Sequence, residues 1–68
     1  MLKMSIDGDY IELIKLLKAT GICESGGAAK IAVDEGYVKV DWLVESRKRC
    51  KIRKGQVVEI DGNFIEVE

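Results

Sequence analysis

The spacing of apolar residues along the chain changes at Gly36. Before that residue, apolar side chains recur every three or four positions, which is the period of a helix with one buried face. After it they alternate with polar side chains, which is the period of a strand packed on one side. Helices come first and short strands follow, so the order predicts an α+β fold, with two packed helices followed by a small, mainly antiparallel sheet.

The first helix is expected over about residues 10–19. Asp9 and Glu12 have the spacing of a capping box, and Gly21 stands where a glycine often ends a helix. The core stripe of this helix is expected to consist of four residues at helical spacing: Tyr10, Leu13, Ile14 and Leu17.

A second helix is expected between Ser25, as its N-cap, and Gly36, as its end. The connection from the first helix is short, so the two helices are expected to pack as a pair. The face that allows close packing consists mostly of small apolar residues: Ala28, Ala29, Ile31, Ala32 and Val33.

Short strands are expected after the second helix. Val38 and Val40 share one face of a strand, and residues 41–42 interrupt the alternation as a turn. Residues 57–60 alternate again and lead into Asp-Gly-Asn at residues 61–63, which is a strong hairpin signal.

The length of 68 residues predicts one domain. We expect residues 1–8 to be a frayed lead-in with a short strand near residues 4–6, and residues 9–68 to form the domain. The N-terminal residues do not have the pattern of an export signal, and no apolar stretch approaches the length of a membrane span. A cytoplasmic location is therefore expected.

Reactive side chains are scarce. The chain has no histidine, which is the commonest general base near neutral pH, and no recognisable nucleophile motif. Cys23 and Cys50 form no metal-ligand cluster, so we expect two reduced thiols and no metal. No catalysis, cofactor or small-molecule substrate is expected.

Charge is distributed unevenly along the chain. The net charge is only −1, but residues 25–54 carry eight Lys or Arg against four acids, and residues 55–68 carry four acids and no base. The weak net charge is thus a cancellation between a basic middle and an acidic end. Such an asymmetry indicates a charged partner.

The basic residues concentrate in ESRKRCKI, residues 45–52, and in the two residues that follow it. If this stretch is an extended strand, Cys50 and Ile52 face the core, and Lys48, which shares their parity, lies at an edge or bulge. The opposite face then carries a ladder of four cations: Arg47, Arg49, Lys51 and Arg53.

With two helices followed by short strands, the chain resembles the RNA-binding domain family named after ribosomal small-subunit protein S-four. Within that family it resembles the small stand-alone bacterial members, the YbcJ-like proteins. The stretches ESGGAAKIA and ESRKRCKI resemble that subgroup. The resemblance implies the fold called the alpha-L motif, and RNA as the ligand. It rests on Leu13 through Lys18, Gly21, Ser25, Ala29-Lys30, Gly36 through Val40, and Gly55 before Val57 to Ile60.

Two positions depart from the pattern of many family members. Ser25-Gly26 stands where Ser-Arg is frequent, which removes a basic side chain from the start of the second helix. Asp41-Trp42 stands where Asn-Gly is frequent, and Trp does not readily adopt a positive φ. The YbcJ-like subgroup shares the first departure.

The resemblance implies RNA contacts in the basic cluster, where arginine can bind phosphate through two N–H groups and stack on bases. An unremarkable charge run would be only solvated surface. A second candidate is the start of the second helix at Ser25-Gly26, where free N–H groups attract phosphate and Lys30 lies one turn further on. The residues expected to contact RNA are Arg47, Lys48, Arg49, Lys51, Lys39, Lys30, Ser25 and Gly26.

Trp42 is expected either to stack on an unpaired base or to cover the edge of the sheet. Lys39 is expected to point outward beside it, and Tyr37, also outward, is a weaker candidate. Arg47→Ala and Arg49→Ala are expected to weaken RNA binding more than Lys48→Ala.

The sequence also bears on two other functions. A DNA-reading helix-turn-helix is rejected, because its recognition helix would carry GGAAKIAVDE, with one Lys, two acids and no Arg, Asn or Gln. A protein-interaction module that docks on a ribosome-associated partner stays open as the alternative. The expected partner is structured RNA, with ribosomal RNA as one possibility. The chain is expected to act as a monomer, and no membrane is expected as a partner.

Overall fold

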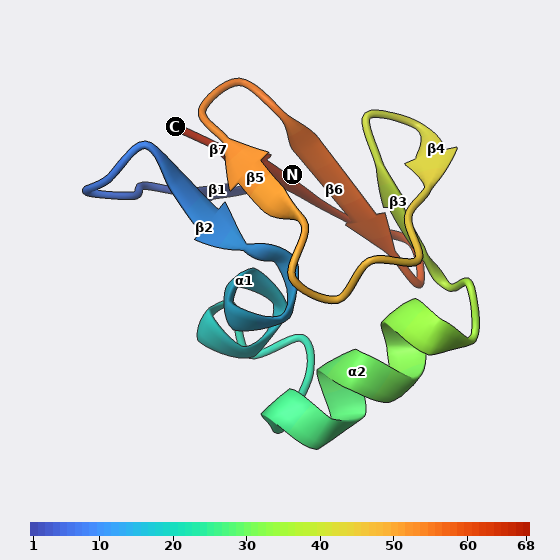
Figure 1. The fold of residues 1–68 in the computed structure, drawn as a ribbon. Coiled ribbons are helices and arrows are strands. Elements are labelled where there is room, and N and C mark those ends of the chain that lie inside the picture. Colours follow the sequence, from blue (N-terminus) through green and yellow to red (C-terminus); the bar gives the residue numbers. More distant parts are fainter.

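The structure is a computed structural model that describes residues 1–68. It contains two helices, α1 (Leu13–Ala19) and α2 (Gly26–Asp34), that lie together below the strands in Figure 1. The strands are β1 (Leu2–Met4), β2 (Tyr10–Glu12), β3 (Val38–Val40), β4 (Leu43–Val44), β5 (Lys51–Arg53), β6 (Val57–Ile60) and β7 (Asn63–Val67).

The strands form two sheets. Five of them are arranged in the order β1-β7-β6-β3-β4, in which β1 is parallel to β7 and the other pairs are antiparallel. The other two, β2 and β5, pair antiparallel as a separate ribbon, and β2 leads directly into α1 (Figure 1). The predicted α+β fold, with two helices and a mainly antiparallel sheet, is confirmed. No helix is both long enough and apolar enough to cross a membrane.

One core joins the helices to both sheets. It consists of aliphatic side chains, one alanine and one cysteine, and contains no aromatic ring. Ala29 on α2 is fully buried, and its small side chain lets α2 approach α1 closely. The buried residues are Leu13, Leu16, Leu17, Cys23, Ala29, Val33, Val38, Val40, Ile52, Val58, Ile60, Ile65 and Val67.

The first helix begins later than the sequence predicts. Residues 10–12 form β2 instead of a helical turn, and Glu12 is the N-cap residue without a capping side-chain bond. The first N–H groups of α1 are satisfied by tertiary contacts, because Leu13 donates to the carbonyl of Cys50 at 2.9 Å and Ile14 to that of Lys48 at 3.2 Å. Pairing with β5 therefore overrides the local capping signal at Asp9, and Tyr10 lies on the surface instead of in the core.

The second helix and the strand after it lie where the sequence predicts. The predicted packing face is wrong for Ala28 and Ile31, which are exposed, and only Ala29 and Val33 of that face are buried. Ser25 caps α2, since its hydroxyl accepts a hydrogen bond from the backbone N–H of Ala28 at 3.1 Å. Gly36 follows the helix with φ +79°, a left-handed conformation that suits glycine. Val38 and Val40 are buried while Lys39 between them is exposed, as the alternation predicts.

The N-terminal residues differ from the frayed lead-in that the sequence predicts. Leu2–Met4 forms an edge strand, and the expected strand near residues 4–6 is shifted toward the terminus. Leu2 pairs with Ile65, and the N–H of Ile6 donates to the carbonyl of Glu68 at 3.0 Å. Backbone pairing with β7 orders this segment, and apolar periodicity alone does not reveal such pairing.

Both predicted turns are present, and Asn63, which the sequence placed in the hairpin turn, already belongs to β7. Asp61-Gly62 connects β6 to β7 with φ values of 50° and 79°, which are typical of a tight hairpin turn. Asp41 and Trp42 connect β3 to β4 with φ values of 49° and 74°, so Trp42 adopts the conformation that its residue type disfavours.

Side-chain contacts hold the turn at Asp41-Trp42. The carboxylate of Asp41 accepts hydrogen bonds from the N–H of Val57 at 3.0 Å and from Nε2 of Gln56 at 2.9 Å. These bonds, the backbone one first, lower the pKa of Asp41 from its usual value. The ring of Trp42 lies 5.8 Å from that of Phe64.

Candidate nucleic-acid interface

The basic run does not form one long strand. Only Lys51–Arg53 is extended as β5, and residues 45–50 form a loop with a turn in which the N–H of Cys50 donates to the carbonyl of Arg47 at 3.2 Å. The predicted ladder of cations is therefore wrong for Arg47 and Arg49. The loop curves because two of its carbonyls accept from the first N–H groups of α1.

Strand β5 does present the predicted two faces. Ile52 is fully buried, and Lys51 and Arg53 on either side of it are exposed. In the register with β2, Arg53 is opposite Tyr10, and Lys51 is opposite Glu12. These four side chains share the outer face of the ribbon, because side chains alternate between the two faces of a strand.

Tyr10 is a candidate that sequence reasoning missed, since its helical spacing placed it in the core. Tyr10 is 42% exposed, and its ring lies beneath two cations. Nζ of Lys51 is 4.9 Å from the ring centroid, and Cζ of Arg53 is 5.8 Å from it. Both distances are within the range of a cation–π interaction. Neither Lys51 nor Arg53 takes part in any of the ion pairs of the chain.

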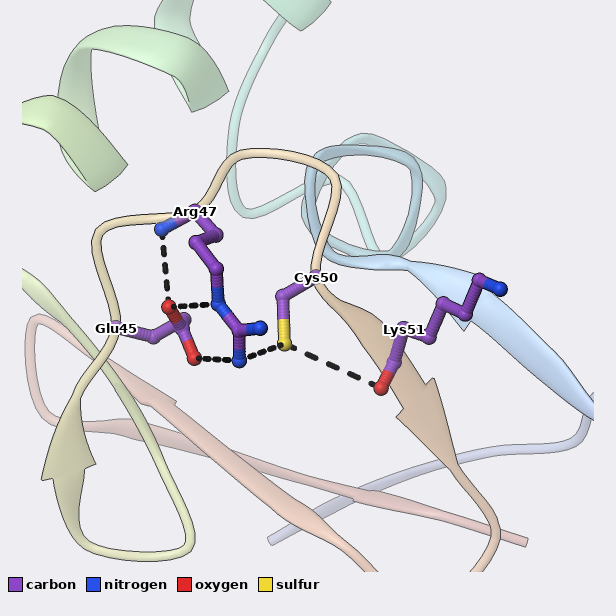
Figure 2. A network of polar contacts seen from close by, with 4 residues as sticks. All are labelled: Glu45, Arg47, Cys50 and Lys51. Atoms are coloured by element: carbon purple, nitrogen blue, oxygen red, sulfur yellow. Dashed lines mark hydrogen bonds and ion pairs between the residues drawn. The ribbon is translucent and has the colours of Figure 1, made fainter.

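Arg47 is held by its neighbour Glu45, as Figure 2 shows. Nε and Nη2 of the guanidinium donate to the two carboxylate oxygens, each at 3.0 Å, and the backbone N–H of Arg47 donates to Oε2 at 3.0 Å. These bonds from Arg47 lower the pKa of Glu45 to about 2. The pair fixes the guanidinium and offsets its charge.

The other two cations of the loop are also paired with acids. Nε of Arg49 donates to Glu12 at 3.1 Å, and Nζ of Lys48 lies 3.3 Å from the carboxylate of Asp34. Glu12 comes from β2 and Asp34 from α2, so these ion pairs connect the loop to two other elements. Arg49 uses only Nε in its pair, so its two terminal nitrogens stay available to a ligand.

Four of the basic side chains, two from the loop and two from β5, line an open hollow of about 470 Å³. Cys50, which also lines it, accepts a weak hydrogen bond from Nη2 of Arg47 at 3.7 Å (Figure 2). Burial, and then the hydrogen bond with Glu45, raise the pKa of the Cys50 thiol. The thiol therefore stays neutral near pH 7 and adds no negative charge. The lining residues are Arg47, Arg49, Cys50, Lys51 and Arg53.

The remaining candidates do not line this hollow. Ser25 and Gly26 lie at the start of α2, where the hydroxyl of Ser25 is already used as the cap, and Lys30 lies one turn further along the helix. Lys39 lies on β3 opposite Glu59 of β6. A methyl group at Gly26 would meet nothing within 4 Å, so packing does not require glycine there.

Trp42 and Tyr37 lie elsewhere on the surface. Trp42 is exposed but packs against Phe64, which agrees with the expectation that it covers part of the sheet. Tyr37 lines a second hollow, of about 530 Å³, together with two acids, Glu59 and Asp61. An anionic ligand is disfavoured beside these carboxylates.

Two proteins with names that refer to RNA or the ribosome are similar to this chain over most of its length. "Putative RNA-binding protein YbcJ" of Escherichia coli is 55% identical over 58 residues, which are 85% of this chain and 83% of that protein. "Probable ribosome maturation protein RlbA" of Bacillus subtilis is 39% identical over 59 residues, which are 87% of this chain and 83% of that protein.

A solved structure has the same fold. The solution structure of Escherichia coli YbcJ, described as revealing an alpha-L motif involved in RNA binding, superposes with a TM-score of 0.76 and 50% identity. The superposition covers 98% of this chain and 86% of the other. The model of the S4 domain family matches residues 4–68, which include β2, both helices and β5. The chain therefore belongs to the S4 domain family, as its sequence pattern predicts.

Proposed function

We propose that the chain is a small, non-catalytic RNA-binding protein that acts as a cytoplasmic monomer. Its ligand is structured RNA, with ribosomal RNA as the class that the ribosome-maturation relative suggests. The observation that carries the proposal is the free pair of cations on β5, Lys51 and Arg53, at the rim of a hollow that Arg47 and Arg49 also line.

The charges of this surface suit a phosphate backbone. Lys51 and Arg53 are exposed and have no acidic partner, so binding a phosphate breaks no ion pair. Arg47 and Arg49 are already oriented by Glu45 and Glu12, which lowers the entropy that they lose on binding. We propose Lys48, Lys39, Lys30, Ser25 and Gly26 as peripheral contacts, because they lie outside the hollow.

RNA is favoured over duplex DNA because the surface offers positive charge but no helix that could contact base edges in a major groove. Helix α2 carries a single cation, Lys30, and an acid, Asp34, so it lacks the side chains that read base edges in a major groove. A surface of this kind recognises the shape of a nucleic acid and the position of its phosphates.

The proposal is tested by gel-shift titration against RNA and DNA stem-loops of the same sequence. We expect tighter binding to RNA, and binding that weakens as salt rises because phosphate contacts release counterions. Equal affinity for both nucleic acids contradicts the preference for RNA. Binding to neither favours the alternative, docking on a protein, and the exposed apolar pair Leu43 and Val44 on edge strand β4 is then the surface to examine.

A further inference from the structure

Tyr10 is placed differently from the other aromatic residues of the chain. None of the four aromatic side chains belongs to the buried core, so each needs its own explanation. Trp42 and Phe64 pack on each other, and Tyr37 lies beside two acids. Tyr10 alone lies under cations, on the outer face of the ribbon that also forms the basic hollow.

We propose that Tyr10, together with the guanidinium of Arg53, forms a stacking site for one unpaired RNA base. The phosphates that flank this nucleotide then lie in the adjacent hollow, against Arg47 and Arg49. This inference rests on the proposed RNA binding and narrows it to RNA that offers a bulged, looped or terminal nucleotide.

The position of the ring supports stacking. Lys51 and Arg53 both contact the ring of Tyr10 and both line the hollow, so one nucleotide can reach the ring and the cations together. Neither cation is held by an acid, so Lys51 can move from the ring to a phosphate, and Arg53 can turn toward a base beside the ring, without breaking an ion pair. Tyrosine rings and arginine guanidinium planes are the groups on which unpaired RNA bases stack.

Phosphate binding alone does not account for Tyr10. A neutral ring adds nothing to the attraction of phosphate, and Tyr10 stays 42% exposed, so part of its surface is open to a ligand. A base in a regular duplex is stacked on both sides by its neighbours, so it is not available to the ring. The site therefore distinguishes an RNA with a free base from one without.

The experiment compares three blunt RNA duplexes by fluorescence anisotropy. One is fully paired, one carries a single bulged nucleotide, and one carries the same bulge without its base. The abasic bulge keeps the phosphates and the bend of the backbone, so its difference from the intact bulge measures the base alone. We expect the wild-type chain to prefer the intact bulge over the abasic one by roughly five- to a hundredfold, the range for one stacked base.

Three substitutions assign this preference to the ring. Tyr10→Leu should reduce the preference to below about twofold, and Tyr10→Phe should keep it, because stacking needs the ring and not the hydroxyl. Tyr37→Leu is the matched control, since it removes an exposed tyrosine ring beside acids. Circular dichroism confirms that each variant is folded.

The outcomes separate this inference from the proposed function. Equal affinity of the wild type for the intact and abasic bulges overturns the stacking site while RNA binding stands, and this comparison needs no variant. A preference that survives Tyr10→Leu also overturns it. If the wild-type chain binds none of the three RNAs, the proposed function is overturned, and the stacking site with it.

Discussion

The two halves of the basic run differ in how much of their charge is available to a ligand. In the loop, Arg47, Lys48 and Arg49 each pair with an acid. On β5, Lys51 and Arg53 pair with none and lie over a tyrosine ring. A sequence that reads as one cluster of positive charge therefore forms two surfaces, one partly neutralised and one free. Which residues are free depends on the acids that the fold brings near, and not on the density of charge along the chain.

The largest expected effect is on the free energy of unfolding, because the two halves of the basic run differ in how deeply they are buried. Ile52 is fully buried, whereas Cys50 in the loop is only half-buried. Ile52→Ala is expected to lower the free energy of unfolding by about 2–4 kcal/mol, the usual result of a cavity in a core. Cys50→Ala should cost under about 1 kcal/mol, because the removed group is small and partly exposed. Urea denaturation measures both, and equal losses contradict the comparison.

The free half is expected to dominate RNA binding. The double variant Lys51→Ala/Arg53→Ala should weaken binding by at least roughly tenfold and make the slope of affinity against salt shallower by roughly 1.5, as two lost phosphate contacts imply. Lys18→Ala, an exposed lysine near the end of α1, is the control, because it lies outside the hollow. If Lys18→Ala weakens binding as much as the double variant, the contacts are not on β5.

Single substitutions in the paired half are expected to have intermediate effects. Arg47→Ala and Arg49→Ala should each weaken binding by about two- to fivefold, since the charge of each contact that is lost is already partly offset by an acid. Lys48→Ala should change affinity by less than about twofold, because Lys48 does not line the hollow. Salt titrations of the three variants test this order, and a larger loss for Lys48→Ala than for either arginine reverses it.

The smallest expected effect is the pH dependence of the Glu45–Arg47 pair. The pKa of Glu45 is lowered to about 2 in the fold, below its usual value of 4.5, so the pair stabilises the chain above pH 4.5 and loses this effect as pH falls toward 2. Because Arg47 is exposed and screened by solvent, the contribution is small.

Glu45→Gln measures this contribution directly. The variant should be slightly less stable than the wild type at pH 7, and the difference should shrink as pH falls below 4.5 and vanish below about pH 2. Urea denaturation at several pH values gives both numbers. A difference that grows as pH falls has the wrong sign for this pair.

The elements with a local signal in the sequence were predictable. The period of the apolar residues gave α2 and β3, Ser25 marked the start of a helix, and Asp61-Gly62 marked a hairpin. The family pattern in Gly36 through Val40 also identified the fold. In each case, residues close together in the sequence determine the structure.

The elements made by distant segments were not predictable. Asp9 and Glu12 signal a capped helix, but pairing with β5 makes Tyr10–Glu12 a strand. The same pairing explains why Tyr10 was missed as part of the site. The sequence indicated where the charges gather, but the acids that neutralise Arg49 and Lys48 come from β2 and α2, and no local pattern shows these contacts.

The pairing of β2 with β5 also has a consequence for the order of folding. Tyr10 and Arg53 come from opposite parts of the chain, and so do Leu2 and Ile65 in the pairing of β1 with β7. Contacts between distant segments form late, because closing the long loop between them costs entropy before any contact compensates it. The outer face of the β2–β5 ribbon should therefore form late in folding, and a synthetic peptide of residues 45–54 should behave as a simple polycation without it.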